Sequence, residues 1–375
     1  MNIPFNIPFI SGNEVTYINE VIHEKVFSSP GKFAKKCETE LTILTGCDDI
    51  RLTTSCTSAL ELAALAIDLK VGDEIILPSF TFVSSANAFA LRGAKLVFVD
   101  INPKTMCLDE TLLEKAITPR TKAVVLVHYA GLTEHIEKVV EFCKNNNIFL
   151  IEDAAQSIDS YYKNKHLGTF GDLGCFSFHD TKNIHCGEGG AILINNKSLI
   201  EKVTIILEKG TNRAAFLSGK IDNYTWKSLG SSYGLSEINA AFLFAQLQEL
   251  KKVTKKRKEL YSLYQNQLQP LKEKGLIDFP ETTNNHNAHI SFIKTKDLVS
   301  RNNLIAHLKS NGIAAYFHYS PLHLSEMGKH YSFVNSRNDF SVTESEKMVR
   351  LPLFYELTEN EVEWVCKGVK RFFTA

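Results

Sequence analysis

The sequence contains no Cys-x-x-Cys pair, although it has eight cysteines. They are scattered along the chain, and most lie in apolar runs: Cys37, Cys47, Cys56, Cys107, Cys143, Cys175, Cys186 and Cys366. This spacing argues against a small secreted domain held together by disulfides, and it is typical of reduced, buried thiols. We therefore expect a cytoplasmic protein.

An excess of charge of either sign is also absent, because 42 basic side chains balance 42 acidic ones. The basic residues form no block longer than Lys255-Lys256-Arg257, and this short block is typical of the solvent-exposed face of a helix. Nucleic acid and anionic membranes are therefore not expected partners. No apolar run approaches the roughly 20 residues of a membrane span. Residues 1–14 lack the basic and apolar regions of a signal peptide, so we expect none.

Two common nucleotide-binding motifs are missing as well. Gly219-Lys220 is followed by isoleucine and lacks the upstream glycine of a phosphate-binding Walker loop. No G-x-G-x-x-G follows the first expected strand. ATP and NAD are therefore disfavoured as ligands.

What the sequence does contain is a regular alternation of short apolar strands and helices. Expected strands cover 51–53, 74–77, 95–99, 123–127, 148–151, 175–178 and 191–194, and expected helices cover 13–26, 33–44, 57–69, 83–91 and 133–145. Continuously apolar strands indicate a sheet that is covered on both faces. The pattern predicts an α/β protein with a doubly wound, mostly parallel sheet.

A second, smaller unit is expected after this alternation. A long helical pattern over 235–263 leads into expected strands at 289–293 and 314–318 and helices at 298–309 and 359–372. We predict a large domain over 1–245, including an N-terminal arm, and a smaller α/β C-terminal domain over 246–375.

Ligands of such sheets bind beyond the carboxyl ends of the strands, where several candidate residues fall. Asp153 ends a strand, and a carboxylate there either caps a helix or holds a ring nitrogen protonated. Thr57 and Ser58 open an apolar helix, so their hydroxyls either cap it or help to bind a phosphate. Phe82 either packs in the core or stacks on a planar ring.

Lys182 lies in a polar turn between a strand and the glycine cluster Gly187, Gly189 and Gly190. A lysine amine whose pKa is lowered by its surroundings is able to bond covalently to an aldehyde and to move protons. The neighbouring Cys175, His179, His185 and Cys186 raise a zinc alternative, but their spacing matches no standard zinc framework. We therefore expect no metal.

The order of these residues along the chain is a stronger indication of the ligand than any single residue. A phosphate cup, a stacking aromatic, a strand-end Asp153 with Gln156 three positions later, and Lys182 after the serine-bearing strand of Ser177 form a coherent site. Together they predict pyridoxal 5'-phosphate (PLP) as the cofactor.

Several longer stretches show a resemblance to a known family. They are SCTSALELAAL from Ser55, LPSFTFVSSANAFALRGAKLVFVDI from Leu77, IEDAAQS from Ile151, LGTFGDLGCFSFHDTKNIHCGEGGA from Leu167, SSYGLSEINAA from Ser231 and LPLFYEL from Leu351. The chain resembles the PLP-dependent sugar-nucleotide aminotransferases of fold type I nearly end to end. Within that family it looks closest to the branch that makes dTDP-4-amino-4,6-dideoxygalactose. The resemblance implies the aspartate aminotransferase-like fold.

The resemblance also implies roles for single residues. Lys182 matches the lysine that holds the cofactor covalently, and Asp153 matches the partner of its pyridine nitrogen. Gln156 matches the residue near the phenolic oxygen, and Phe82 matches the stacking aromatic. The positions that match phosphate contacts are Thr57, Ser58 and Ser177, together with Ser232, whose counterpart reaches across from the other subunit of a homodimer.

The implied reaction transfers an amino group from L-glutamate to a nucleotide-linked keto-sugar. The expected acceptor is dTDP-4-keto-6-deoxy-D-glucose, aminated at carbon 4; amination at carbon 3 and UDP- or GDP-linked sugars remain alternatives. Lys182 argues against the related dehydratase branch, which has histidine there, and against a non-catalytic regulator. Arg213 and His323 are candidate sugar-nucleotide contacts, or else a surface arginine and a core histidine.

Overall fold

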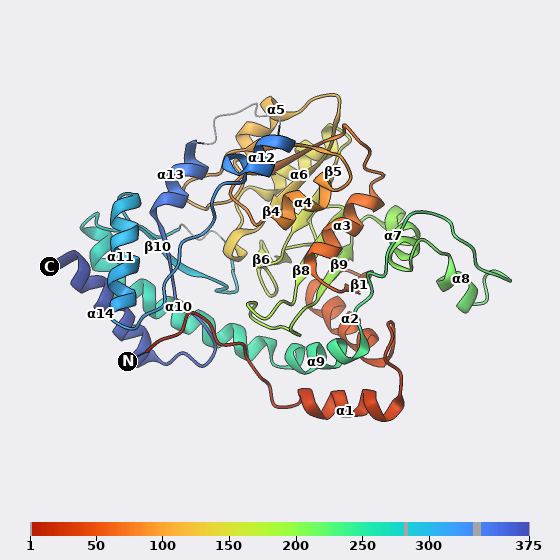
Figure 1. Ribbon diagram of the computed structural model, residues 1–375, viewed down its shortest axis with the longest axis horizontal. Helices are drawn as coiled ribbons and strands as arrows, with labels where there is room; N and C mark the ends of the chain where they lie inside the picture. Colours follow the sequence, from red (N-terminus) through yellow and green to blue (C-terminus); the bar gives the residue numbers. More distant parts are fainter. Residues whose placement is uncertain (1, 281–283, 333–338, 375) are drawn as a thin grey trace.

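The computed structural model describes residues 2–280, 284–332 and 339–374. Its centre is a seven-stranded sheet in the order β1-β9-β8-β5-β4-β2-β3 (Figure 1). The strands are β1 Ile50–Thr53, β2 Glu74–Pro78, β3 Lys95–Val99, β4 Thr121–Val127, β5 Phe149–Asp153, β8 Leu173–Ser177 and β9 Gly190–Ile194. Neighbouring strands from β3 to β8 run parallel, whereas β9 is antiparallel to both β8 and β1. The prediction of an α/β fold with a mostly parallel sheet is confirmed.

Helices cover both faces of this sheet, as the apolar strands predicted. In β4, Val125 and Val127 belong to one apolar cluster and Val124 and Leu126 to another, because successive side chains point to opposite faces. The covering helices are α2 Lys32–Thr45, α3 Cys56–Ala66, α4 Ser84–Ala90, α5 Leu113–Ala116, α6 Ile136–Asn145, α7 Ile200–Leu207 and α9 Glu237–Gln248. α1 Glu14–Glu24 packs on α9, on the side away from the sheet (Figure 1). With both faces covered, ligands reach the sheet at its strand ends.

The prediction of a single helix over 235–263 is wrong, because the segment forms two helices. α9 ends at Gln248, and Glu249, with φ −100° and ψ 0°, separates it from α10 Leu250–Glu273. α9 packs on the cluster that contains Leu243 and Leu247, and α10 packs on a different cluster through Leu260 and Tyr264. The break lets two apolar helix faces serve two separate clusters.

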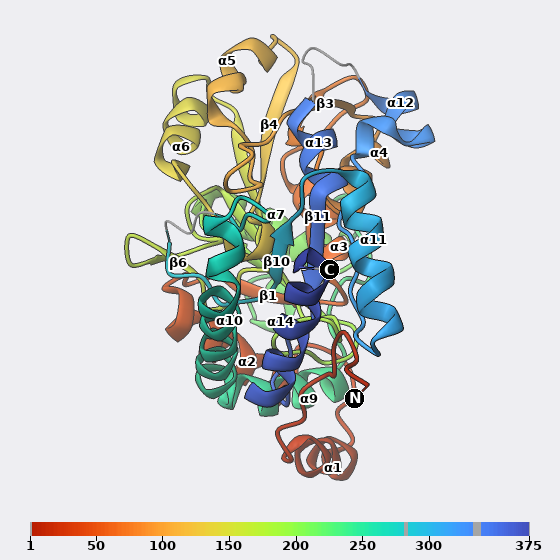
Figure 2. The same cartoon turned by 90° about the vertical axis from the view of Figure 1, so that its left-hand side faces the viewer.

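The C-terminal part has its own apolar cluster, around the antiparallel pair β10 Ser291–Lys294 and β11 Met348–Leu351. α10, α11 Leu298–Ser310 and α14 Glu359–Thr374 surround this pair (Figure 2). The shorter elements are α8 Arg213–Leu217, α12 Glu326–Tyr331, α13 Asp339–Lys347, β6 Tyr161–Tyr162 and β7 Lys165–His166. The division into domains at 245 and 246 stays a prediction.

The strand predicted over 314–318 does not form. Ile313 makes an isolated bridge with Ile3 of the N-terminal arm, and Tyr316 makes another with Arg350 of β11. Because the segment changes its partner after only two residues, no ladder can extend. Within the described ranges, no helix has the length and apolarity needed to cross a membrane.

Candidate active site

A cavity of about 510 Å³ lies at the carboxyl ends of β5 and β8, beside the first turn of α3. Its volume falls in the range that is usual for small-molecule sites. Of the residues predicted from the sequence, six line it: Thr57, Phe82, Asp153, Gln156, Ser177 and Lys182. Strand ends that are far apart in sequence thus meet at one edge of the sheet.

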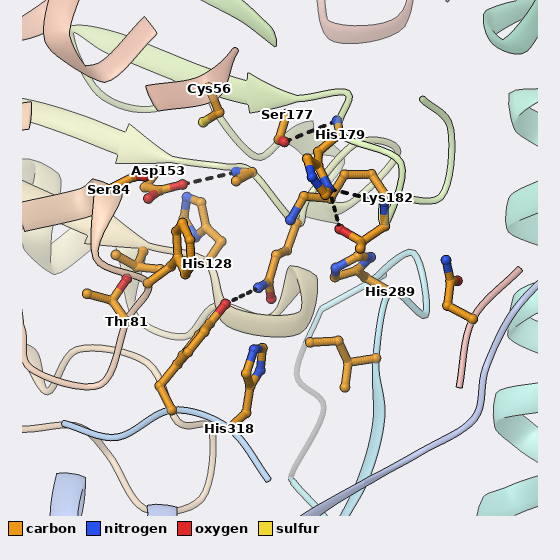
Figure 3. A pocket seen from close by; sticks show the side chains of 18 of the residues that line it. Cys56, Thr81, Ser84, His128, Asp153, Ser177, His179, Lys182, His289 and His318 are labelled. Atoms are coloured by element: carbon orange, nitrogen blue, oxygen red, sulfur yellow. Dashed lines mark hydrogen bonds between the residues drawn. The ribbon is translucent and has the colours of Figure 1, made fainter. Parts of the chain in front are cut away.

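Lys182 enters this cavity from the turn that follows β8 (Figure 3). The turn is closed by hydrogen bonds from Lys182 N to His179 O at 2.9 Å and from Asp180 N to Gly187 O at 2.9 Å. Burial lowers the pKa of the Lys182 amine, and the positive charge of Arg350 lowers it further. The negative charge of Asp153 works in the opposite direction without reversing the shift. A larger fraction of neutral amine makes Lys182 a better nucleophile and base.

Asp153 is held in a chain of buried hydroxyl groups. Ser85 Oγ donates to Asp153 Oδ2 at 2.5 Å, and Ser85 Oγ also lies 2.8 Å from Thr81 Oγ1. The backbone N–H of Ala155 donates to Asp153 Oδ1 at 3.2 Å. These donors satisfy the carboxylate oxygens of Asp153 and fix their direction at the edge of the cavity.

The preceding residue, Glu152, anchors the same strand end from the opposite face. Its fully buried carboxylate receives hydrogen bonds from the N–H groups of Gly168, Phe170 and Gly171, and it lies 2.8 Å from His128 Nε2. Burial alone would raise the pKa of Glu152, but His128 and these N–H groups together lower it. The hydrogen bonds to the Glu152 carboxylate fix the end of β5. The backbone of the next residue, Asp153, is therefore held rigidly.

Gln156 joins two further segments to the site. Its Oε1 accepts the backbone N–H of Ala130 at 2.6 Å, and its Nε2 donates to Tyr319 Oη at 3.2 Å. Ala130 has φ 58°, a left-handed conformation that this contact helps to hold. The amide of Gln156 is thereby oriented at the cavity wall.

The start of α3 supplies a second group of donors. Ser55 caps the helix by accepting Ser58 N at 3.0 Å, and Thr57 Oγ1 lies 2.7 Å from Ser84 Oγ. Ser58 is outside the cavity lining, because its hydroxyl bonds to those of Thr54 at 2.8 Å and Ser55 at 3.0 Å. Ser177 closes this part of the cavity. Hydroxyl groups and free helix N–H groups together favour an anion.

Gly190 explains how α3 comes so close to Ser177. Gly190 pairs with both Thr53 and Ser177, and the chain of Ser55 and Cys56 passes directly over it. A Cβ built on Gly190 would lie 2.4 Å from Ser55 C and 2.5 Å from Cys56 N. Only glycine leaves room for this approach.

The variant Gly190→Ala should therefore displace the start of α3 from Ser177. We expect a loss of about 1–3 kcal/mol in the free energy of unfolding, as for other insertions into packed sites. Cofactor affinity should fall as well. Urea unfolding and cofactor titration measure the two effects, with Gly234→Ala as the control because its Cβ would meet nothing closer than 3.4 Å. Equal stability and affinity in the two variants would contradict this account.

Phe82 lies at the cavity with half of its side chain exposed, and its ring centroid is 6.1 Å from that of Tyr319. An exposed aromatic at a cavity rim is free to stack on a planar ligand. The core alternative for Phe82 does not hold.

Three other predicted residues lie outside the cavity lining of this chain. Ser232 is exposed and makes an isolated bridge with Glu208. Arg213 is exposed on α8, 3.5 Å from Glu208 Oε2. His323 Nδ1 lies 2.6 Å from Ser79 Oγ. Their roles toward substrate or a partner subunit stay predictions.

The residues of the zinc alternative point to separate places. His185 Nε2 lies 2.8 Å from Phe9 O, and Cys186 Sγ approaches Glu188 O at 3.4 Å. His179 faces Thr181 and Asp180, each at 2.9 Å. Among the described residues, no group of three or more His, Cys, Asp or Glu side chains is arranged to hold a metal ion.

The sequence did not point to several cavity residues that come from other parts of the chain. His289 Nδ1 lies 2.9 Å from Oδ1 of Asn183, the residue next to Lys182. His318 and Tyr319 stack with their ring centroids 3.5 Å apart. Burial lowers the pKa of His318 to about 2 and raises the pKa of Tyr319 well above its usual range, so both side chains are neutral. Arg350 completes this group.

The sequence profile of the DegT/DnrJ/EryC1/StrS aminotransferase family matches residues 8–370. The chain belongs to this family. It is 31% identical to the spore coat polysaccharide biosynthesis protein SpsC of Bacillus subtilis, over 98% of this chain and 96% of SpsC.

Solved structures of aminotransferases agree with this membership. The aminotransferase TlmJ from Streptoalloteichus hindustanus has a TM-score of 0.91 and 25% identity, covering 100% of this chain and 99% of that one. The sugar aminotransferase Spr1654 from Streptococcus pneumoniae, in its PLP form, has a TM-score of 0.89 and 26% identity, covering 99% and 98%. Helicobacter pylori PseC, an aminotransferase of pseudoaminic acid biosynthesis, has a TM-score of 0.89 and 25% identity, covering 100% of each chain. This family member is therefore a PLP-dependent sugar aminotransferase.

The chemistry of the cavity fits this cofactor. It offers an amine for the aldehyde, a hydrogen-bonded carboxylate for the ring nitrogen, and hydroxyl and N–H groups at a helix start for the phosphate. Lys182, Asp153, Thr57 and Ser177 are the residues that would hold it.

Proposed function

We propose that this aminotransferase moves an amino group from L-glutamate to carbon 4 of dTDP-4-keto-6-deoxy-D-glucose, which gives dTDP-4-amino-4,6-dideoxygalactose. The observation that carries the aminotransferase chemistry is the buried amine of Lys182 in one cavity with Asp153 and the start of α3. The sugar rests on the resemblance of the long stretches around Leu77 and Leu167.

In this proposal Lys182 would hold the cofactor covalently in the resting enzyme. When the donor is bound, the Lys182 Nζ would take the proton from the donor's amino-bearing carbon, and in the second half-reaction it would deliver a proton to carbon 4 of the sugar. The bound cofactor supplies an electron sink for the broken bond. Asp153 would keep the pyridine nitrogen protonated, since an ionised carboxylate favours the charged ring. Gln156 would orient the phenolic oxygen, Phe82 would stack on the ring, and Thr57 and Ser177 would bind the phosphate. Ser58 would contribute to phosphate binding only if its hydroxyl turned from those of Thr54 and Ser55 toward the cavity.

The direct test is to incubate the cofactor-loaded enzyme with L-glutamate and candidate keto-sugar nucleotides and to identify the product by NMR. A 4-amino-4,6-dideoxy sugar of galacto configuration on dTDP is expected. A 3-amino product, or turnover only with a UDP- or GDP-linked sugar, would replace the proposed acceptor. Substrate contacts by Arg213 and His323 belong to the same proposal and should appear as a raised KM for the sugar in their alanine variants.

We further propose a cytoplasmic homodimer whose active site is completed at the subunit interface by Ser232 of the partner subunit. All eight cysteines are free and buried, in keeping with a reducing compartment. The segment around α8 extends away from the main body (Figure 1), and its apolar side chains are exposed: Phe216, Leu217, Tyr224, Trp226 and Leu229. A second copy of the chain would cover them.

Light scattering should therefore give about twice the chain mass of 42.1 kDa. The double variant Leu217→Gln/Trp226→Gln should raise the dissociation constant of the dimer about tenfold or more, because buried aromatic side chains contribute much of the binding energy of interfaces. Val299→Gln removes an equally exposed apolar side chain from α11 and should leave the mass unchanged. A wild-type mass of 42.1 kDa would overturn the dimer.

A further inference from the structure

His289 reaches the active-site cavity from the segment just before β10, and its neighbours determine which ring nitrogen carries a hydrogen. Its Nδ1 lies 2.9 Å from Oδ1 of Asn183. The amide nitrogen of Asn183 donates to Asn287 O at 3.0 Å, so the Asn183 oxygen is the atom that faces His289. An oxygen can only accept there, which places the hydrogen on Nδ1. In a neutral ring, Nε2 is then a free hydrogen-bond acceptor.

The surroundings of His289 keep its ring neutral. Burial lowers the pKa of His289 well below its usual range, and the positive charges of Lys182 and Arg257 lower it further. Among the described residues, none donates a hydrogen bond to Nε2. A bare ring nitrogen at a cavity wall needs a donor, because a buried acceptor without one costs free energy.

The main chain that carries His289 is held by two buried side chains. Asn287 accepts the backbone N–H of His289 at 3.1 Å through its Oδ1 and donates to Gln156 O at 3.0 Å through its Nδ2. Arg257 Nη2 donates to His289 O at 2.7 Å. With the main chain and Nδ1 both fixed, the direction of Nε2 is fixed as well.

The amine of Lys182 is the donor that lies closest at hand. Asn183 follows Lys182 in the chain, so its hydrogen bond joins the ring of His289 to the turn that carries the amine. Of the charged groups around His289, Lys182 has the largest effect on its pKa, as a near neighbour should. Figure 3 shows Lys182 and His289 on the same side of the cavity.

The amine is also free to turn toward the ring. No hydrogen bond joins Lys182 Nζ to another group of the described chain, and the long, flexible stem of the lysine allows Nζ to move within the cavity. A hydroxyl of the sugar is the alternative donor for Nε2. Such a hydroxyl is present only in the second half-reaction, whereas Lys182 is present in both.

We propose that His289 is a positioning residue for Lys182, whose amine donates a hydrogen bond to His289 Nε2 while the donor is bound. This bond directs the lone pair of Nζ toward the donor's amino-bearing carbon. The proton taken from that carbon stays on Nζ, and the imidazole gains none. The resulting ammonium group keeps the same acceptor, in a stronger, charge-assisted hydrogen bond. The proposal rests on the proposed function only in that Lys182 moves this proton, whichever keto-sugar is the acceptor.

Two substitutions separate the roles of the two ring nitrogens. His289→Asn keeps a nitrogen that can donate to Asn183 but has no acceptor at the position of Nε2. His289→Gln loses the Nδ1 contact but places an amide oxygen near the position of Nε2. In the cofactor-loaded His289→Asn variant, the rate of the first half-reaction at saturating L-glutamate should fall on the order of 10- to 100-fold. His289→Gln should recover part of this loss, and the KM for L-glutamate should stay within about twofold in both variants.

The control His286→Asn makes the same substitution in the same segment. His286 accepts the N–H of Ala288 at 3.2 Å through Nδ1 and lies outside the cavity lining. Its rate should stay within about threefold of wild type. An equal loss in His286→Asn and His289→Asn would assign the effect to the segment and overturn the role of Nε2.

Two further measurements would not respond to a merely structural role. L-glutamate deuterated at its amino-bearing carbon should show a larger isotope effect on the first half-reaction in His289→Asn than in wild type, because the proton transfer becomes slower relative to the other steps. Nitrogen NMR of ¹⁵N-histidine-labelled, cofactor-free wild type should show His289 with a protonated Nδ1 and a bare Nε2. A protonated Nε2 would overturn the proposal even if neither His289 variant folds.

Equal rates in folded His289→Asn and His289→Gln, or an unchanged isotope effect, would also overturn the proposal. A loss confined to the second half-reaction would overturn it too, and would identify a sugar hydroxyl as the donor to Nε2. If wild type aminates none of the keto-sugars, the proposed acceptor fails, while the first half-reaction with L-glutamate still decides the role of His289.

Discussion

Replacing Lys182 with alanine should lower kcat/KM on the order of 10³- to 10⁴-fold, an increase of about 4–6 kcal/mol in the activation free energy. The variant loses both the covalent hold on the cofactor and the base that moves the proton. No other amine takes its place, because Arg257 and Arg350 are the other basic side chains with long stems in the lining and a guanidinium is a poor base. The change in absorbance of the bound cofactor on adding L-glutamate measures the first half-reaction.

Two controls distinguish lost chemistry from lost structure in this variant. Methylamine added to Lys182→Ala should restore part of the rate, since a small amine can enter the space left by the side chain and carry the proton. Lys252→Ala removes an exposed lysine that pairs with Glu249 and should retain wild-type activity. Activity of Lys182→Ala within tenfold of wild type would refute the role given to this lysine.

The sequence was sufficient to predict the sheet and the residues at its strand ends. Parallel strands align their carboxyl ends, so Asp153 after β5 and Ser177 at the end of β8 had to share one edge. Lys182 follows within the same local segment, and Thr57 lies in the first turn of a strongly apolar helix. Each of these positions depends mainly on local pattern.

The opposite wall of the cavity could not be predicted in the same way. Arg350 and His289 lie far along the chain from Lys182, and only the packing of the C-terminal strand pair brings them to it. The sequence does indicate that Ser85 lies near the site, because Ser84 and Ser85 begin α4 just after Phe82. Its hydrogen bond to Asp153 depends on how α4 lies against β5, which local pattern does not specify.

Asp153→Asn is the second variant for which we expect a large effect, a loss on the order of 10³-fold in kcat. Asparagine has nearly the same shape, so the N–H of Ala155 keeps an acceptor. The negative charge that favours a protonated pyridine nitrogen is lost, and with it the ring's capacity to accept electrons from the donor carbon. The loss should appear in kcat with a smaller change in KM, because the charge acts mainly in the transition state.

Ser85→Ala provides the matched comparison for this effect. It removes the 2.5 Å hydrogen bond to Asp153 but leaves the carboxylate charged, so we expect a loss of about tenfold or less. The nitrogen chemical shift of ¹⁵N-labelled cofactor reports ring protonation directly, and it should change in Asp153→Asn and stay near wild type in Ser85→Ala. Equal losses in the two variants would mean that geometry, and not the charge of Asp153, controls the reaction. Since the donor carbon must lose its proton before any sugar is aminated, this comparison holds for every candidate acceptor.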